Sequence, residues 1–172
     1  LAATGGFSDL NTVADATTSV LNAYGLGAEE ATRITDQFIQ TQNDGKIVIG
    51  QYAANIAKVA PVASALGIGL DEVNAAVAQI TGTGTGAEVT FTALKTAFAQ
   101  LASGGVGEKL KEFGVNIDAN TIAADGFIGT LEKIKNSGAD TGAILKAFGT
   151  EAGPVLQPLL NDFDKLNRLL EN

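Results

Sequence analysis

The chain has 172 residues and a net charge of −8, is 45% hydrophobic, and contains no cysteine, histidine or methionine. This apolar content is too high for a disordered chain, and the length predicts one domain with a substantial buried core. The composition excludes disulfides, thiol chemistry, a histidine general base and the usual zinc ligands, and the acidic balance argues against a phosphate-binding surface.

The N-terminal quarter of the chain predicts two helices joined by a glycine turn. Apolar residues recur at helical spacing over 9–24, and Ser8 is the expected N-cap of this helix. Gly25 follows its last turn and is expected to adopt the left-handed conformation, with Leu26 folding back on the helix. A second helix is expected over 28–41, with two glutamates in its first turn, where the helix dipole favours negative charge.

The central block, 46–103, predicts three further helices, each apolar on one side only. The first ends at Gly67, and Pro61 within it is expected to kink it after Lys58. The second covers about 70–81, and a Gly/Thr loop leads into the third. A helix with an apolar stripe on one side is not stable alone in water, so the three helices are expected to pack together as the core. The core stripe is Ile49, Tyr52, Ile56, Val59, Leu66, Val73, Ile80, Phe91, Leu94, Phe98 and Leu101.

Shorter elements are expected beyond the central block. A helix over 106–113 stops at Gly114, and the alternating residues 115–118 predict a brief extended strand. Asp125 is the expected N-cap of another helix, which buries Ile128 and two further apolar residues one and two turns later.

The C-terminal part predicts two more helices. Asp140 or Thr141 caps the first, which ends at Gly149. Pro154 begins the last, because proline is favoured at the first helical position. The leucine-rich stripe of 154–172 continues to the end of the sequence. The chain is therefore expected to be a segment of a longer polypeptide in which this helix continues.

Helix-ending glycines give the fold its expected character. Gly25, Gly67, Gly114 and Gly149 each follow a large apolar residue that closes a predicted helix, and much of the high glycine content, 21 residues, is interpreted in this way. The predicted fold is all-α: one domain over 1–172, with about seven to eight short helices packed compactly as hairpins and without the fixed period of a solenoid.

Two motifs invite a ligand-binding interpretation. The loop Gly82–Gly86 precedes a helix, but no strand precedes it and no Lys-Ser/Thr pair follows, so both phosphate-loop motifs fail. Asp118, Asn120 and Asp125 suggest calcium, but an EF-hand loop needs an oxygen ligand at its fifth position and glycine at its sixth. A flexible loop and an N-cap explain these motifs, and no metal, nucleotide or other cofactor is expected.

Paired acids and a tyrosine are the remaining candidates for chemistry. Glu29–Glu30 and Asp71–Glu72 are adjacent in sequence, so within each pair the side chains diverge on a helix and cannot form a facing carboxylate pair. Stabilisation by the helix dipole explains both pairs. Tyr52 is expected in the core with its hydroxyl at the rim. No catalytic residue is therefore assigned.

Several motifs, in their order, resemble the core region of phage tail tape measure proteins (TP901-type family). The central motifs are KVAPVASALG at 58–67, DEV at 71–73, ITG at 80–82 and AL at 93–94. The flanking motifs are AATGGFSD at 2–9, LKEFGV at 110–115 and FGTEAG at 148–153. The resemblance therefore covers nearly the whole chain.

The resemblance implies a structural protein of the virion. Tape measure proteins lie in the tail lumen after assembly in the host cytoplasm, set tail length, scaffold tail-tube assembly and leave ahead of the DNA at infection. The implied partners are the tail-tube protein and tail assembly chaperones, with self-association in the lumen. Sequence-specific nucleic-acid binding is not implied, and no apolar run is long enough to indicate membrane contact. The alternatives are an all-helical scaffold or adaptor that binds partner helices, and an enzyme that uses only carboxylates and tyrosine.

Overall fold

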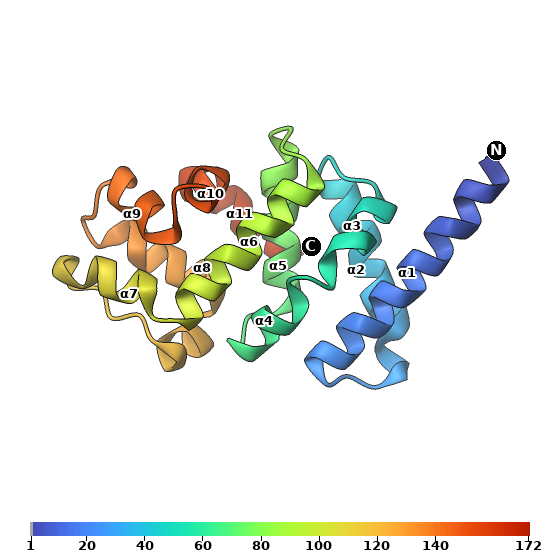
Figure 1. Ribbon diagram of the computed structural model, residues 1–172, viewed down its shortest axis with the longest axis horizontal. Helices are drawn as coiled ribbons and strands as arrows, with labels where there is room; N and C mark the ends of the chain where they lie inside the picture. Colours follow the sequence, from blue (N-terminus) through green and yellow to red (C-terminus); the bar gives the residue numbers. More distant parts are fainter. Residues whose placement is uncertain (1) are drawn as a thin grey trace.

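The computed structural model describes residues 2–172, with the side chains of residues 9–172, and this part of the chain is all-helical without a strand. It contains eleven α-helices, more than the expected seven to eight, and two short 3-10 helices, η1 and η2 (Figure 1). Two expected helices are each divided in two, which accounts for part of the difference. The elements are α1 Ala2–Tyr24, η1 Ala28–Glu30, α2 Ala31–Asp44, α3 Ile49–Ile56, α4 Ala60–Ala65, α5 Leu70–Gly82, α6 Ala87–Ala102, α7 Gly105–Leu110, η2 Lys111–Phe113, α8 Ala119–Asn136, α9 Thr141–Phe148, α10 Ala152–Asn161 and α11 Phe163–Glu171.

Helix α1 begins earlier than its apolar pattern predicts. It starts at Ala2 and runs through Ser8, so the expectation that Ser8 is an N-cap is wrong. Toward its N-terminus the helix extends away from the other elements (Figure 1). At its C-terminus Gly25 has φ 64°, and the Leu26 N–H donates to the Leu21 carbonyl at 2.8 Å, which is the hydrogen bond of a Schellman ending.

The helix expected to end at Gly67 is broken rather than kinked. Helix α3 ends at Ile56 and α4 begins at Ala60, with Pro61 in its first turn. Proline has no N–H to give to the carbonyl four residues earlier and its ring crowds that carbonyl, so the helix cannot continue through Ala57. The intervening residues form tight turns, in which the Val59 N–H donates to the Ile56 carbonyl at 3.0 Å.

The region before and within α8 differs from expectation. Residues 115–118 form a loop, not a strand, and Asp118 is the N-cap of α8, where its carboxylate accepts two backbone N–H bonds. Asp125 lies inside α8 instead of capping it, and pairs with Lys133. Gly126, with φ 71° and ψ −174°, kinks the helix, so the second half of α8 has an N-terminus of its own.

The last two helices form where one was expected. Helix α10 ends at Asn161, and Asp162, with φ −148° and ψ 81°, separates it from α11. The Asp162 carboxylate accepts the Lys165 N–H at 2.8 Å and so caps α11. Before them, α9 is capped by Asp140 and is followed by Gly149, whose φ of 107° and ψ of 151° are accessible essentially to glycine alone.

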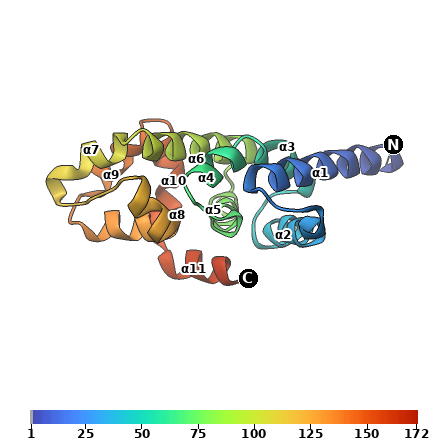
Figure 2. The same cartoon turned by 90° about the horizontal axis from the view of Figure 1, so that it is seen from below.

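Helix α5 lies at the centre of the molecule, and it is buried on every side, not only along its expected apolar stripe. Every residue from Val73 to Thr81 is buried, so the helix is covered all round. Helices α2, α4, α6, α8, α10 and α11 all contact it (Figure 2). Among the expected core residues only Ile49 is partly exposed.

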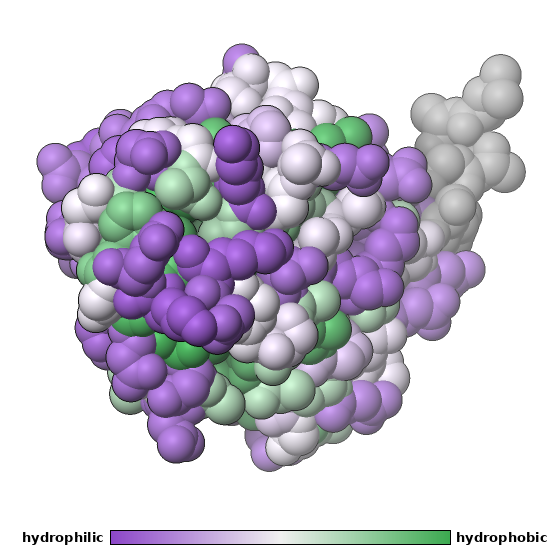
Figure 3. Space-filling model, turned by 60° about the vertical axis from the view of Figure 1, so that its left-hand side comes forward, coloured by the Kyte–Doolittle hydropathy of each residue, from purple (hydrophilic) through white to green (hydrophobic). Residues whose placement is uncertain are grey.

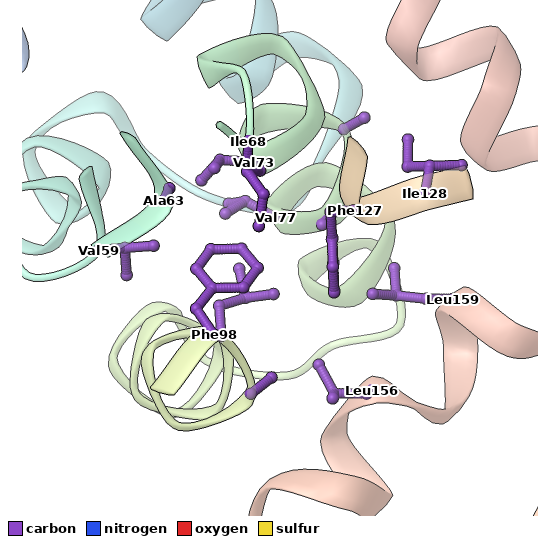
Figure 4. Close-up of a cluster of buried hydrophobic side chains, with 14 of the residues drawn as sticks. Val59, Ala63, Ile68, Val73, Val77, Phe98, Phe127, Ile128, Leu156 and Leu159 are labelled. Carbon is purple, nitrogen blue, oxygen red and sulfur yellow. The ribbon is translucent and has the colours of Figure 1, made fainter. Parts of the chain in front are cut away.

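Aromatic rings connect the two ends of the core. Phe98 of α6 and Phe127 of α8 meet edge to face with centroids 4.9 Å apart, beneath Val73 and Val77 of α5 (Figure 4). Toward the N-terminal end, Tyr52 packs against Phe38 and Phe91 with centroids 4.7 and 5.6 Å apart. Because rings at such distances and angles attract beyond their area burial, they fix α3, α6 and α8 around α5.

Two helix-ending glycines allow a matched test of backbone conformation against packing. Gly25 and Gly67 have φ of 64° and 74°, but a methyl group at 25 would meet nothing within 4 Å, whereas one at 67 would lie 3.1 and 3.2 Å from Ala123 Cβ and Cα. Gly25→Ala is expected to destabilise by about 1–2 kcal/mol, the left-handed penalty alone. Gly67→Ala is expected to cost about 1 kcal/mol more, because α4 and α8 must separate. Urea denaturation of both variants measures the difference, and equal losses would contradict this explanation.

Candidate functional site

Tyr24, Asp71 and Glu72 form a cluster of a tyrosine and two carboxylates at the junction of α1 and α5. It contains the residue types that a tyrosine–carboxylate enzyme would use. A pocket of about 260 Å³ lies beside it, lined partly by Tyr24, Asp71 and Arg33. Arg33 also pairs with Glu30, one of the two acids expected in the first turn of the second helix. The chemistry of this cluster therefore depends on whether its polar groups are free.

The Tyr24 hydroxyl is committed to the backbone. It donates to the Ile68 carbonyl at 3.0 Å, which ties the end of α1 to the turn before α5. Burial raises the pKa of Tyr24 far above its ordinary value, and the charges of Asp71 and Glu72 raise it further. The phenol therefore keeps its proton at neutral pH and acts as a structural donor, not as a base.

Glu72 joins two helix N-termini. Its Oε2 accepts the Gly69 N–H at 3.3 Å at the start of α5, and its Oε1 accepts the Ile128 N–H at 3.1 Å at the start of the second half of α8. A side chain at Gly126 would collide with this carboxylate. Burial raises the pKa of Glu72, although the backbone N–H bonds oppose the shift. The carboxylate thus satisfies donors at two helix ends, where the dipoles favour negative charge.

Other polar side chains of α5 also connect it to its neighbours. The Tyr52 hydroxyl of α3 is fully buried and donates to Asn74, so the expected position at the rim is wrong. Thr81 Oγ1 accepts the Lys46 N–H at 3.3 Å, in the turn between α2 and α3. Each buried polar group needs a partner within the protein because water cannot reach it, and these contacts supply one.

Gln79 occupies the break between α10 and α11. Its Nε2 donates to the carbonyls of Pro158 and Asp162, at 2.8 and 2.9 Å, and the side chain is only 2% exposed. The Pro158 carbonyl lies at the end of α10, where the helical ladder is interrupted, and the Asp162 carbonyl lies at the start of α11, where it also accepts the Leu166 N–H at 3.2 Å. The Gln79 amide therefore joins the two sides of the break. Sequence reasoning missed this contact because Pro158 and Asp162 lie 79 and 83 residues after Gln79 in the chain.

The two ligand motifs have structural roles. The loop Gly82–Gly86 joins α5 to α6, and the hydroxyls of Thr83 and Thr85 lie 3.2 Å apart. Asp118 caps α8 while Asp125 pairs with Lys133, so the carboxylates proposed for calcium are used separately. Within the described residues, no three acidic side chains are grouped so that they could hold a metal ion.

The surface bears a few large apolar side chains that the sequence analysis did not single out. The most exposed are Leu10, Val48 and Val89, with Ile39 on α2 less so. On the face in Figure 3, apolar patches alternate with hydrophilic side chains. Val89 could have been noticed in the sequence, because it does not fit the stripe of Phe91, Leu94 and Phe98 in the same helix. None of the helices in the described part of the chain is long and apolar enough for a membrane span.

The comparisons with known proteins indicate a phage tail origin. A family model described as "Phage-related minor tail protein" matches residues 1–152. The "Probable tape measure protein" of the Clostridium phage phiCD119 is 40% identical over 70 residues, which are 41% of this chain and 7% of the relative. No solved structure matches the chain.

The raised pKa of Glu72 predicts a specific dependence of stability on pH. The folded protein holds this proton more tightly than the unfolded chain, whose carboxyl titrates near the ordinary value of 4.5. The stabilisation is therefore fully present below that pH and is lost as the pH rises through the folded pKa. The free energy of unfolding of the natural protein, relative to Glu72→Gln, is expected to fall as the pH rises from 4.5 through the pKa of the folded carboxyl group. Urea denaturation across this range measures it, with Glu112→Gln as the control for loss of one exposed charge. A difference that stays constant or rises with pH contradicts the assignment.

The role of Gln79 predicts a large cost for removing its donor. In Gln79→Glu, a buried carboxylate without a proton to give would face the carbonyl oxygens of Pro158 and Asp162. The variant is expected to lose more than about 3 kcal/mol of stability. Gln157→Glu, the same change at an exposed site on α10, is expected to change stability by no more than about 0.5 kcal/mol. Thermal unfolding compares the two, and similar melting temperatures would refute the role.

Proposed function

The chain belongs to the phage-related minor tail protein family, and on this basis we propose that it is a folded segment of a tape measure protein. Its role in the phage tail is structural. The 40% identity to a probable tape measure protein carries the proposal. Because the aligned stretch is only 7% of that relative, the segment would contribute to a much longer ruler and would not form one alone.

The arrangement of the candidate site supports a non-enzymatic role. Two members of the cluster are occupied by hydrogen bonds between elements: Tyr24 donates to a carbonyl and Glu72 accepts from two helix ends. The third, Asp71, is exposed and accepts the N–H of Glu72 within α5. A general base or nucleophile must be free to approach a substrate, and Tyr24 and Glu72 are not. A helical scaffold outside a phage would likewise need no catalytic residue, so a measurement on assembled phage tails is needed to distinguish the two functions.

Placement in the tail lumen, with the tail-tube protein and assembly chaperones as partners, is part of the same proposal, as is self-association there. The net charge of −8 fits a conduit for DNA, because an acidic surface repels phosphate and would not retain the passing genome.

The helix-ending glycines allow two states of the segment in the tail. A continuous helix of this length would measure about 260 Å, at 1.5 Å per residue. As a folded domain the segment has an expected radius of gyration of about 16 Å and spans some 40 Å. We propose that the segment is compact when free, and that in the tail it is either a folded plug or a set of extended helices opened at Gly25, Gly67, Gly114 and Gly149.

An in-frame deletion of the segment tests the function. Tail lengths measured by electron microscopy are expected to shorten, by roughly 260 Å if the segment is extended and by a few tens of Å if it is folded. In-frame duplication is the matched control and is expected to lengthen the tail by the same amount. Tails of natural length after the deletion, with normal assembly, would show that this segment does not contribute to tail length, and the assignment would fail.

A further inference from the structure

We propose that the face formed by α3, α6 and α10 binds an amphipathic helix of another protein segment, whose apolar stripe is flanked by lysine or arginine. Helix α6 packs between α3 and α10 (Figure 1), and a groove lies on each side of its first turns. The inference concerns a binding surface, and it does not require that the segment determine tail length.

The first groove lies between α6 and α10. It has a volume of about 260 Å³, and its apolar lining comes from Val89 and Ala93 of α6 and from Ala152 and Val155 of α10. Val89 is 53% exposed, whereas Ala93 and Ala152 are buried at the bottom of the groove. Small residues at the bottom and larger apolar ones beside them allow a helix to approach closely while it buries its own apolar stripe.

The second groove continues the first on the other side of α6. It has a volume of about 520 Å³ and lies against α3 and α1, with Val48, Gly50 and Asp9 in its lining. Glu88 and Val89 line both grooves, so the two form one surface. Val48 is 58% exposed there. Two of the four most exposed large apolar side chains of the described residues, Val48 and Val89, therefore line one surface.

The charge of this surface identifies the occupant. Asp9, Glu88 and Glu151 line the grooves, and among the residues that the structure describes no lysine or arginine does. Lys95, the one basic residue of α6, is not among the lining residues. A second copy docked face to face would place these acids opposite one another, and DNA would place its phosphates there, so both are disfavoured. A helix with basic residues beside its apolar stripe complements both the charge and the apolar lining.

The probe is a synthetic amphipathic peptide of about 14 residues, or four helical turns, with leucine and alanine on one face and four lysines beside them. Fluorescence anisotropy with the 172-residue chain measures its affinity. The peptide is expected to bind at least tenfold more tightly than the same peptide with glutamates in place of the lysines. Equal affinity for the two peptides, or no binding of the basic one, would overturn the proposal.

Variants locate the binding. Val89→Asp and the double variant Glu88→Lys, Glu151→Lys are each expected to weaken binding of the basic peptide at least tenfold. Ile39→Asp, an equivalent change at an exposed site on α2 outside both grooves, is expected to change it less than twofold. All these side chains are exposed, and circular dichroism melts verify that each variant is folded. Equal losses in Val89→Asp and Ile39→Asp would overturn the proposal. So would self-association of the natural chain that Val89→Asp abolishes in sedimentation velocity, because a second copy would then be the occupant.

Discussion

The burial of α5 from Val73 to Thr81 is the constraint on which the rest of the structure depends. No residue of this stretch is more than 8% exposed, although it contains an asparagine, a glutamine and a threonine. A polar group in such surroundings needs a partner within the protein, and Asn74, Gln79 and Thr81 each form a hydrogen bond with a different element. The amide oxygen of Gln79, by contrast, has no partner among the described residues. Through these contacts, and through Glu72 at its N-terminus, α5 fixes the positions of α3, α8 and the α10–α11 break.

Breaks in the helices follow from the same principle. Wherever the backbone ladder is interrupted, donors or acceptors lose their partners, and a side chain or a turn replaces them. At the kink at Gly126, Glu72 accepts a backbone N–H of α8, and at the break between α10 and α11, Gln79 donates to the Asp162 carbonyl. Glycine and proline therefore divide the chain into short helices, while distant polar side chains stabilise the interrupted ends and hold those helices in one domain.

This use of polar groups bears on function. The groups that could perform chemistry, Tyr24 and Glu72, are engaged in holding helices together, and the remaining acids lie mainly on the surface. What the molecule offers to partners is its shape, an acidic exterior and the apolar grooves beside α6. These are the properties of a structural component, in accord with membership of a phage tail protein family.

The sequence by itself determined the features that depend on a few neighbouring residues: the helical class, most helix positions, the Schellman ending at Gly25 and a cap at Asp140. The order of its motifs also indicated the family, because such motifs are local patterns. Tertiary structure decided the all-round burial of α5, since periodicity identifies apolar residues but cannot show that Asn74 and Gln79 have partners. It also decided the kink at Gly126, where Glu72 accepts the Ile128 N–H and occupies the space that a side chain at 126 would fill. Those partners lie tens of residues away, and only folding brings them within hydrogen-bond distance.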